Sequence, residues 1–272
     1  NNGSVSVLMR NPVDGEWNRY HRLTHPGGAY GFGCSVDFEA DGSGDNIIAV
    51  IGRLNTPNGF AYIHQMAWAD SSWSYVQELV PSALTSAYGG SGAIEAGRVV
   101  VGDLQGAGLS TGHVFLYELD EMTGIWSETQ HLTPNLIGSN HSIAYDVDLK
   151  GDVLVLGGSN VDEVASNAGV TYVYRQGMSG DFELEQTLTA TDYGSNDHFG
   201  AAVAIGDGEL FITADGDDDN GRDAGAIYVF REEVACTEYN LEFQSGSGIA
   251  ADVTYEVLDE SGMVTFLSGN NP

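Results

Sequence analysis

The sequence predicts an all-β protein, a β-propeller made of four-stranded antiparallel blades. Two observations predict this fold: a repeat with a period of 53 to 57 residues, and apolar residues that alternate at every second position within each repeat. The 37 glycines supply the turns that many short strands need. Four short strands within a period of roughly 40–60 residues describe one propeller blade.

Three sequence markers share this period and define the repeat. A glycine opens an apolar strand at Gly3, Gly59, Gly112, Gly169 and Gly225. An aromatic residue opens the following strand at Trp17, Trp73, Trp126 and Phe182. A leucine comes six residues later, at Leu23, Leu79, Leu132 and Leu188. We therefore expect the four aromatic residues to occupy equivalent positions in the outer strands of successive blades.

Two further strands precede the glycine-led strand in each repeat. The first is rich in small residues, as in residues 200–205, and we expect it to be innermost because the blades crowd together around the central channel. The second is an apolar run, as in residues 153–157, and we expect it to be buried on both faces. Helical repeats are excluded because the apolar spacing is two residues and not 3.6.

The repeat resembles a known family, the FG-GAP repeats of integrin α-subunit propellers and their secreted relatives. The last repeat is the most similar, with Asp197-His198-Phe199-Gly200 followed by the apolar runs 210–214 and 225–230. The Phe-Gly pair recurs, increasingly altered, as Phe32-Gly33, Tyr88-Gly89 and His141-Ser142. The resemblance covers residues 1–232, and it implies an extracellular propeller domain over that range.

Residues 233–272 form a second region, for which two interpretations stay open. In the first, residues 253–257 and 263–267 are the inner strands of the opening blade, and both termini close a five-bladed ring. In the second, the region begins a separate β-sandwich module, and the four to five blades before it belong to a seven-bladed ring. Both interpretations predict a β-hairpin within residues 233–272.

The charge balance excludes some classes of partner. The chain has 39 acidic and 9 basic residues, which give a formal net charge of −30. Such a field repels nucleic acid and anionic lipid and attracts divalent cations. The alternative explanation of the charge is solubility in a salty medium. No run approaches about 18 apolar residues, so the sequence predicts no membrane span.

One acidic segment has the spacing of a calcium-binding loop. Its oxygens come from Asp37, Glu39, Asp41, the backbone carbonyl of Ser43, and Asp45. A glycine lies at the sixth position, where such a loop turns sharply. The segment is similar to the calcium loop of integrin α-subunits, from which Glu39 departs by its length. The sequence therefore predicts one structural Ca²⁺ here, and the alternative is a solvated acidic hairpin.

A second acidic loop is a possible further metal site. It offers the carboxylates of Asp215, Asp217, Asp219 and Asp223. Its glycine comes one position later than in the first loop, and Arg222 adds a competing cation. The alternative is a charged surface loop without a metal ion.

Few other residues stand out as sites. Asn2 and Asn140 begin N-glycosylation sequons. Cys34 and Cys236 are the two cysteines, and they pair with each other, pair with a further segment, or stay reduced. The sequence shows no nucleophile elbow, phosphate loop or paired-cysteine motif, so we expect no enzyme.

These features favour an extracellular adhesion or structural module that binds calcium, within a surface appendage or filament. Its expected partners are protein or glycan ligands at the propeller faces, or copies of itself in an assembly. The alternative is a non-catalytic accessory domain or glycan-binding domain of a larger secreted enzyme. In the glycan-binding case, aromatic residues such as Trp68 and Tyr88 would stack on sugars.

Overall fold

The alternating apolar segments form antiparallel strands, and the computed structural model contains no helix among the residues that it describes. The described residues are 3–25, 31–41, 44, 46–53, 59–83, 85, 87–104, 112–134, 143–219, 221, 224–231, 254–258 and 264–268. The chain divides into two compact units, Asn1–Glu232 and Glu233–Pro272. Over the described ranges, no segment is a helix of the length and apolarity needed to cross a membrane.

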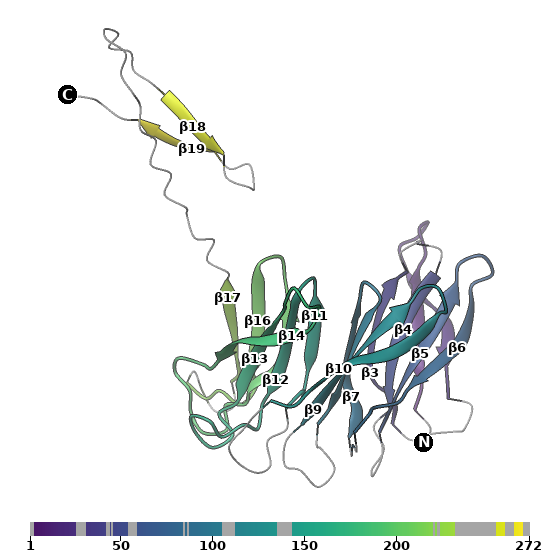
Figure 1. Ribbon diagram of the computed structural model, residues 1–272, viewed down its shortest axis with the longest axis horizontal. Coiled ribbons are helices and arrows are strands. Elements are labelled where there is room, and N and C mark those ends of the chain that lie inside the picture. The colour runs from purple at the N-terminus through teal and green to yellow at the C-terminus, as the bar shows by residue number, and fades with distance from the viewer. Residues whose placement is uncertain are drawn as a thin grey trace. The chain divides into compact units, whose positions relative to one another are not determined.

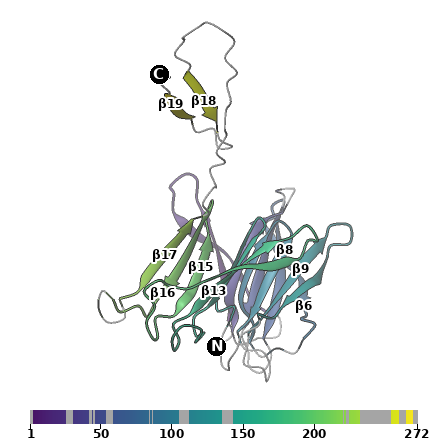
Figure 2. The ribbon, with the colours of Figure 1, turned by 60° about the vertical axis from the view of Figure 1, so that its left-hand side comes forward.

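The strands of the first unit fall into a hairpin and four blades (Figures 1 and 2). The N-terminal hairpin pairs β1 (Val5–Arg10) with β2 (Trp17–Leu23). Blade 1 contains β3 (Phe32–Ala40), β4 (Asn46–Arg53), β5 (Phe60–Ala67) and β6 (Ser72–Leu79). Blade 2 contains β7 (Tyr88–Glu95), β8 (Arg98–Asp103), β9 (His113–Asp120) and β10 (Ile125–Leu132). Blade 3 contains β11 (Val147–Lys150), β12 (Val153–Gly158), β13 (Val170–Gln176) and β14 (Phe182–Leu188). Blade 4 contains β15 (Phe199–Ile205), β16 (Glu209–Ala214) and β17 (Ala226–Arg231).

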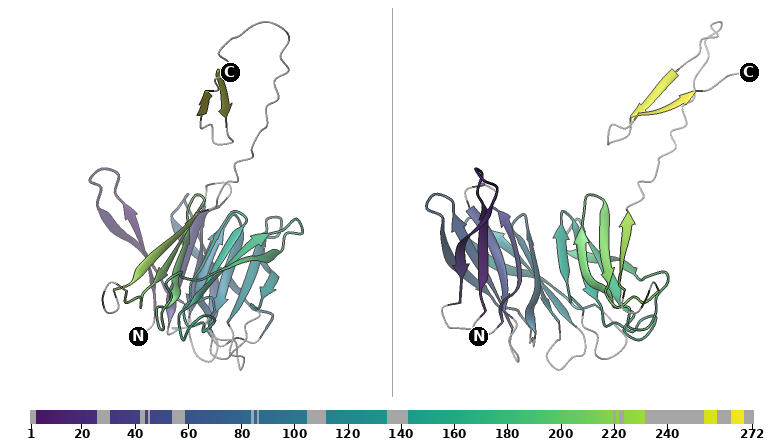
Figure 3. Two further views of the ribbon diagram at one scale, coloured as in Figure 1. Left: turned by 90° about the vertical axis from the view of Figure 1, so that its left-hand side faces the viewer. Right: turned by 180° about the vertical axis from the view of Figure 1, so that it is seen from behind.

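The strands of each blade pair in chain order, and each is antiparallel to the next. The first strands of successive blades contact one another: β7 lies against β3, and β11 lies against both β7 and β15. Figure 3 shows the purple hairpin beside blade 1 and the sheets following one another along the chain. The fold is therefore the predicted all-β propeller, with the small-residue strands where the blades meet most closely.

The outer strands confirm the predicted equivalence of the aromatic residues. Each of these residues lies at or next to the start of its strand and faces a residue near the end of the glycine-led strand; the pairs are Trp17 with Arg10, Trp73 with Met66, Trp126 with Leu119, and Phe182 with Gln176. Each marker leucine is buried at the end of the same strand. Burial of the aromatic residues differs, however: Trp126 is 4% exposed and Trp17 is 66% exposed.

The hydrophobic core lies between the blades. One cluster joins Val50 and Ile63 of blade 1 to Val99, Phe115 and Trp126 of blade 2. Equivalent clusters join blade 2 to blade 3, blade 3 to blade 4, and the hairpin to blade 1. Because each apolar face is covered by the neighbouring blade, the stability of a blade depends on its neighbours.

The Phe-Gly pair has a packing role at these junctions. A Cβ atom on Gly59, which opens the third strand of blade 1, would collide with the carbonyl oxygen of Tyr88 in blade 2. A Cβ atom on Gly169 would collide in the same way with Phe199. The glycine-led strand can therefore approach the start of the next blade only because it has no side chain at that position.

One assignment of the Phe-Gly pair was wrong. The third repeat uses Ile143 and Ala144 at this place, and not His141-Ser142, which lie outside the described residues. A Cβ atom on Gly112 would collide with the carbonyl oxygen of Ile143, as Gly59 would with Tyr88. Ala144 adopts the left-handed conformation, with φ 61°, that Gly89 and Gly200 adopt in the other blades. The junction has kept its backbone shape although its sequence has lost the family's residues.

The second unit contains a β-hairpin, as both interpretations of residues 233–272 predicted. Its strands are β18 (Thr254–Leu258) and β19 (Val264–Ser268), which pair antiparallel with each other.

Candidate functional site

The predicted calcium loop is shorter than expected. Asp37 and Glu39 lie inside β3, where they pair with Val50 and Ile48 of β4. The connection between the two strands begins only at Asp41, because the alternation of polar and apolar residues continues β3 to Ala40. A strand does not curl around an ion, so these two carboxylates lie outside the turn that was predicted to hold them.

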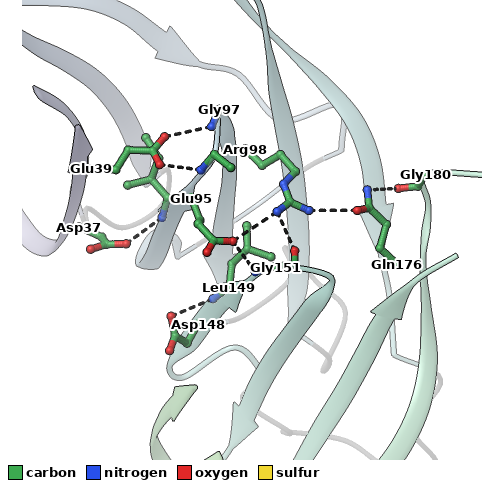
Figure 4. A network of polar contacts seen from close by, with 12 residues as sticks. Asp37, Glu39, Glu95, Gly97, Arg98, Asp148, Leu149, Gly151, Gln176 and Gly180 are labelled. Carbon is green, nitrogen blue, oxygen red and sulfur yellow. Dashed lines mark hydrogen bonds and ion pairs between the residues drawn. The ribbon is translucent and has the colours of Figure 1, made fainter. Parts of the chain in front are cut away.

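Asp37 and Glu39 instead reach the next blade (Figure 4). The backbone N–H of Ile94 donates to Asp37 Oδ2 at 2.8 Å. Both carboxylate oxygens of Glu39 accept from the turn between β7 and β8: the N–H of Ala96 lies at 2.6 Å and that of Gly97 at 3.0 Å. The two turn residues have positive φ, as in a two-residue hairpin turn, and this directs their amides outward to the carboxylate.

The same kind of contact recurs at the following junctions. Glu95 Oε2 of blade 2 accepts from the N–H of Gly151 in blade 3 at 2.5 Å. Asp146 and Asp148 of blade 3 accept from the N–H groups of Val203 and Ile205 in blade 4, at 2.9 and 2.7 Å. We call these carboxylates, which lie in or directly before the first strand of a blade, the inter-blade ties, and they comprise Asp37, Glu39, Glu95, Asp146 and Asp148.

The ties solve a problem that every blade has at its first strand. This strand is the edge of its sheet, so alternate N–H groups have no ladder partner. A charged acceptor makes a stronger hydrogen bond than a neutral one, and the carboxylate comes from the blade before. At one position the charge pattern is reversed: Lys150 of blade 3 contacts Asp207 of blade 4 at 2.5 Å. Part of the acidic composition therefore serves to hold blades together.

Arg98 extends this network between blades 2 and 3 (Figure 4). Its guanidinium donates to Glu95 Oε2 at 3.3 Å, to the carbonyl oxygen of Gly151 at 2.7 Å and to Gln176 Oε1 at 3.1 Å. The planar guanidinium carries several donors in a fixed geometry and so joins three acceptors at one junction. Arg98 neutralises the charge of a partly exposed tie, Glu95, at this junction.

The remaining predicted calcium ligands are only partly described. Asp41 accepts from the N–H of Asn46 at 3.3 Å and from its side-chain amide at 2.5 Å, across the β3–β4 turn. Ser43 and Asp45 lie outside the described residues. Calcium binding at this turn stays a prediction, with Asp41 as its described ligand.

The second acidic loop gathers more carboxylates than its own sequence suggests. Asp217 is buried, and its Oδ2 accepts from the hydroxyl of Tyr228 at 3.0 Å. The same hydroxyl lies 2.8 Å from Asp192, in the loop between β14 and β15. A hydroxyl has one proton, so it cannot donate fully to both carboxylates. Asp223 lies outside the described residues.

Neighbouring charges act on one another in this loop cluster. The Asp217 carboxylate beside it raises the pKa of Asp219, with further contributions from burial and from Asp192 and Asp197. Oδ1 of Asp215 lies 3.1 Å from Nδ1 of His198. Within the described ranges, no three His, Cys, Asp or Glu side chains are placed to hold a metal ion together.

Sequence reasoning missed two members of this cluster. Asp192 and Asp197 precede blade 4 and are distant in sequence from the 215–223 loop. Asp197 is buried and its carboxylate accepts from the N–H of Gly194, while its carbonyl accepts from Gly216 at 3.1 Å. No local spacing signals such a contact, because it depends on two loops meeting at one end of the blade.

The other candidate residues have mixed outcomes. Tyr88 is buried, and its hydroxyl donates to that of Tyr117 at 2.8 Å, so its proposed role as a sugar-stacking surface residue was wrong. Trp68 lies at the turn after β5 and is 44% exposed. Cys34 is exposed at the surface of β3, with its Sγ 3.1 Å from the carbonyl oxygen of Gly89. Asn2, Asn140 and Cys236 lie outside the described residues.

Comparison with known proteins identifies the repeat. Residues 182–230, from β14 to β17, match the family model described as the FG-GAP repeat. No curated protein matches the chain. Among solved structures, the chain is similar to a GH43 endo-arabinanase from Bacillus licheniformis, with 15% identity, a TM-score of 0.43, and coverage of 89% of this chain and 81% of that one.

A second similar structure is an acylaminoacyl peptidase in complex with Z-Gly-Gly-Phe-chloromethyl ketone. It has 9% identity and a TM-score of 0.37, over 72% of this chain and 30% of that one. The chain thus spans less than a third of the peptidase. Both likenesses are too distant to carry an argument about activity. The fold and the family model together identify the chain as a β-propeller that carries an FG-GAP repeat.

Proposed function

We propose that this chain is a non-catalytic module of an extracellular protein, a rigid propeller that presents its loops to other molecules or packs into a larger assembly. The inter-blade ties are the observation that carries the proposal. Asp37, Glu39, Glu95, Asp146 and Asp148 are the kind of residues that do acid–base chemistry, yet each accepts backbone N–H groups of a neighbouring blade. Their chemistry is used to fix the blades.

The loops at one end of blades 3 and 4 are also fixed to each other. Asn167 donates from its side chain to Asn196 Oδ1 at 3.0 Å, and its carbonyl accepts from the N–H of His198 at 3.1 Å. Tyr193 in the same loop is 47% exposed. An exposed aromatic residue held on an ordered polar loop is a favourable recognition surface, because little conformational entropy is lost on binding.

The extracellular location rests on the family. FG-GAP repeats are typical of extracellular proteins, and residues 182–230 of this chain match that repeat. The sequons at Asn2 and Asn140 accord with a secreted protein. Calcium belongs to the proposal as a structural ion at the β3–β4 turn.

Glycan binding is a second candidate, favoured by one observation. Trp68 projects from the turn between β5 and β6 with 44% of its surface exposed. An indole at a loop tip offers a large apolar face on which a sugar ring can stack. A glycan-binding accessory domain of a larger secreted enzyme would use such a residue.

One binding experiment separates these candidates. The purified chain is applied to a glycan array and to a panel of extracellular matrix proteins, beside Trp68→Ala and Tyr193→Ala variants. Protein binding that Tyr193→Ala reduces and Trp68→Ala leaves unchanged would support the recognition module. Glycan binding that Trp68→Ala abolishes would favour the second candidate. Turnover of glycoside or peptide substrates by the purified chain would contradict the non-catalytic proposal.

A further inference from the structure

The outer strand of the N-terminal hairpin differs in charge from the other outer strands. β2 carries Arg19 and Arg22, while the equivalent strands carry Glu78 in β6, Glu128 in β10, and Glu183 with Glu185 in β14. Three of the 9 basic residues of the chain lie in the hairpin, against 39 acidic residues overall. A basic strand on so acidic a protein needs an explanation beyond solubility.

Arg19 and Arg22 form no ion pair with any described residue, although four of the nine basic residues of the chain do. The engaged pairs are Arg98 with Glu95, Lys150 with Asp207, Arg175 with Asp152 and Glu185, and Arg231 with Glu209. Carboxylates outnumber cations about fourfold in this chain, so acidic partners are abundant. Among the described residues, no carboxylate occupies either guanidinium.

β2 is also accessible and partly apolar. Six of its seven residues are exposed, and Trp17 and Tyr20 are 66% and 43% exposed. The side chain at the position of Arg19 is exposed because the outer strand lies at the rim of the propeller. Tyr75 of β6 and Leu184 of β14, each two residues after its marker aromatic, are 49% and 53% exposed although their blades have neighbours.

The rim of blade 3 has the complementary chemistry. β14 exposes Glu183, Leu184 and Glu185, and in the described part of the chain only Glu185 is held by an arginine. Both β2 and β14 are outer strands, so each presents an unpaired edge to the surroundings. Within one chain they lie on the rims of different sheets, separated by blades 1 and 2. Contact between them therefore requires two molecules.

We propose that β2 of one molecule docks on β14 of a second copy of this chain. Arg19 and Arg22 face Glu183 and its neighbours, and Tyr20 packs against Leu184. The two surfaces differ, so the contact is head-to-tail and extends into a row of molecules. The inference deepens the proposed function by naming one partner of the assembly. Global repulsion between copies of charge −30 is screened at physiological salt, where the Debye length is about 8 Å, while charges in contact still attract.

Sedimentation of the full chain over a range of concentrations, at physiological salt, tests the proposal. The wild type should show a mass that rises with concentration. R19E/R22E should associate at least about tenfold more weakly, because like charges then meet at the contact. R231E is the matched control: it reverses an exposed arginine whose carboxylate partner lies in the same blade, and it should associate as the wild type does. Equal melting temperatures would show that each variant is folded.

A mixing experiment makes the test specific for a head-to-tail contact. R19E/R22E and E183R should each remain monomeric when alone. Their equimolar mixture should associate, because R19E/R22E keeps an intact β14 and E183R keeps an intact β2. A wild type that is monomeric at every concentration would overturn the proposal, as would association that R19E/R22E leaves unchanged. Loss of binding to the polyanion heparin in R19E/R22E, with a monomeric wild type, would assign the strand to a glycan partner and overturn the second-copy proposal. None of these outcomes alters the array results that test the proposed function.

Discussion

Carboxylates are crowded in two regions of the propeller, and the two regions use them differently. Along the inner strands of blades 1 to 3, each tie accepts a backbone N–H of the next blade, as Asp37 does from Ile94 at 2.8 Å. In the loops around blade 4, Asp192 and Asp217 share the single hydroxyl of Tyr228, and Asp217 raises the pKa of Asp219. Each carboxylate of the first group has an N–H donor of its own. The carboxylates of the second group share a donor and repel one another.

The difference shows why net charge alone does not describe this protein. A carboxylate that accepts an otherwise unpaired N–H stabilises the fold, because an unsatisfied buried amide is costly. A carboxylate that meets other carboxylates destabilises the fold unless a cation joins it. The same residue type therefore has opposite effects in the two regions, and substitutions can separate them.

The largest loss of stability at a junction with ties is expected from removing an apolar side chain. Trp126 is 4% exposed in the core between blades 1 and 2, so Trp126→Ala should lower the free energy of unfolding by about 3–5 kcal/mol. Trp17→Ala, at the equivalent but exposed position of β2, should cost less than about 1 kcal/mol. Urea unfolding of both variants measures the difference, and equal losses would show that burial does not distinguish the two positions.

The two regions would no longer differ in this way if Asp37 and Glu39 bound calcium together with the β3–β4 turn. With a dissociation constant on the order of 10⁻⁴–10⁻³ M, as in extracellular modules, saturating calcium should raise the melting temperature. At about 100 times that constant the stabilisation is about 2.7 kcal/mol. Asp41→Ala should remove most of the shift, and Asp219→Ala should leave it. The reverse pattern would place the ion in the loops of blade 4. A melting temperature that chelation leaves unchanged would show that the molecule binds no structural calcium ion.

The ties can be tested singly at the junction between blades 3 and 4. Asp148→Ala leaves the N–H of Ile205 without its acceptor and should cost about 1–3 kcal/mol in urea unfolding. Asp148→Asn keeps an oxygen acceptor and should recover much of that loss. If alanine and asparagine are equally tolerated, the contact does not contribute to stability.

The smallest effect concerns pH and salt. Burial raises the pKa of the Asp146 carboxyl, and the Asp217 carboxylate raises that of Asp219. A raised folded-state pKa means that the folded state binds the proton more tightly. The stabilisation that each group gives in acid is therefore lost as pH rises through its folded pKa. Asp146→Asn and Asp219→Asn should each flatten this loss.

Salt distinguishes the two causes of these pKa shifts. The Asp219 effect arises mainly from charge repulsion on an exposed carboxyl and should shrink at high salt, whereas the Asp146 effect arises mainly from burial and should persist. Melting temperatures measured from pH 4 to pH 7, at low and high salt, provide the check. Equal salt sensitivity at both positions would contradict the assignment of separate causes.

The propeller could be predicted because its signals are local and repeated. The marker aromatics and leucines each lie within one strand pair, so their period indicated blades directly. The Phe-Gly position of the third repeat was misplaced because Ile143 and Ala144 keep only the backbone conformation of that pair, with φ 61° at Ala144. Because alanine can adopt this backbone conformation, the identity of the residue does not reveal it.

The site was harder to predict because its partners are distant in sequence. Asp37 and Glu39 matched a calcium spacing, but their partners lie in blade 2, at Ile94 and at the Ala96–Gly97 turn. The strict alternation from Val36 to Ala40 was the signal for a strand, and the metal motif obscured it. Glu95 recurs at the position of Glu39 one repeat later, and Asp148 recurs at the position of Asp37 two repeats later. This recurrence could have indicated a structural role.

The most direct test of the ties is the stability of Asp37→Ala and Asp37→Asn, measured by urea unfolding in calcium and in chelator. If Asp37 holds blade 2 through the N–H of Ile94, Asp37→Ala should lose about 1–3 kcal/mol equally in both conditions, and Asp37→Asn should lose less. A loss that appears only in calcium, and that is the same for alanine and asparagine, would show that Asp37 is a metal ligand and would contradict its assignment as an inter-blade tie.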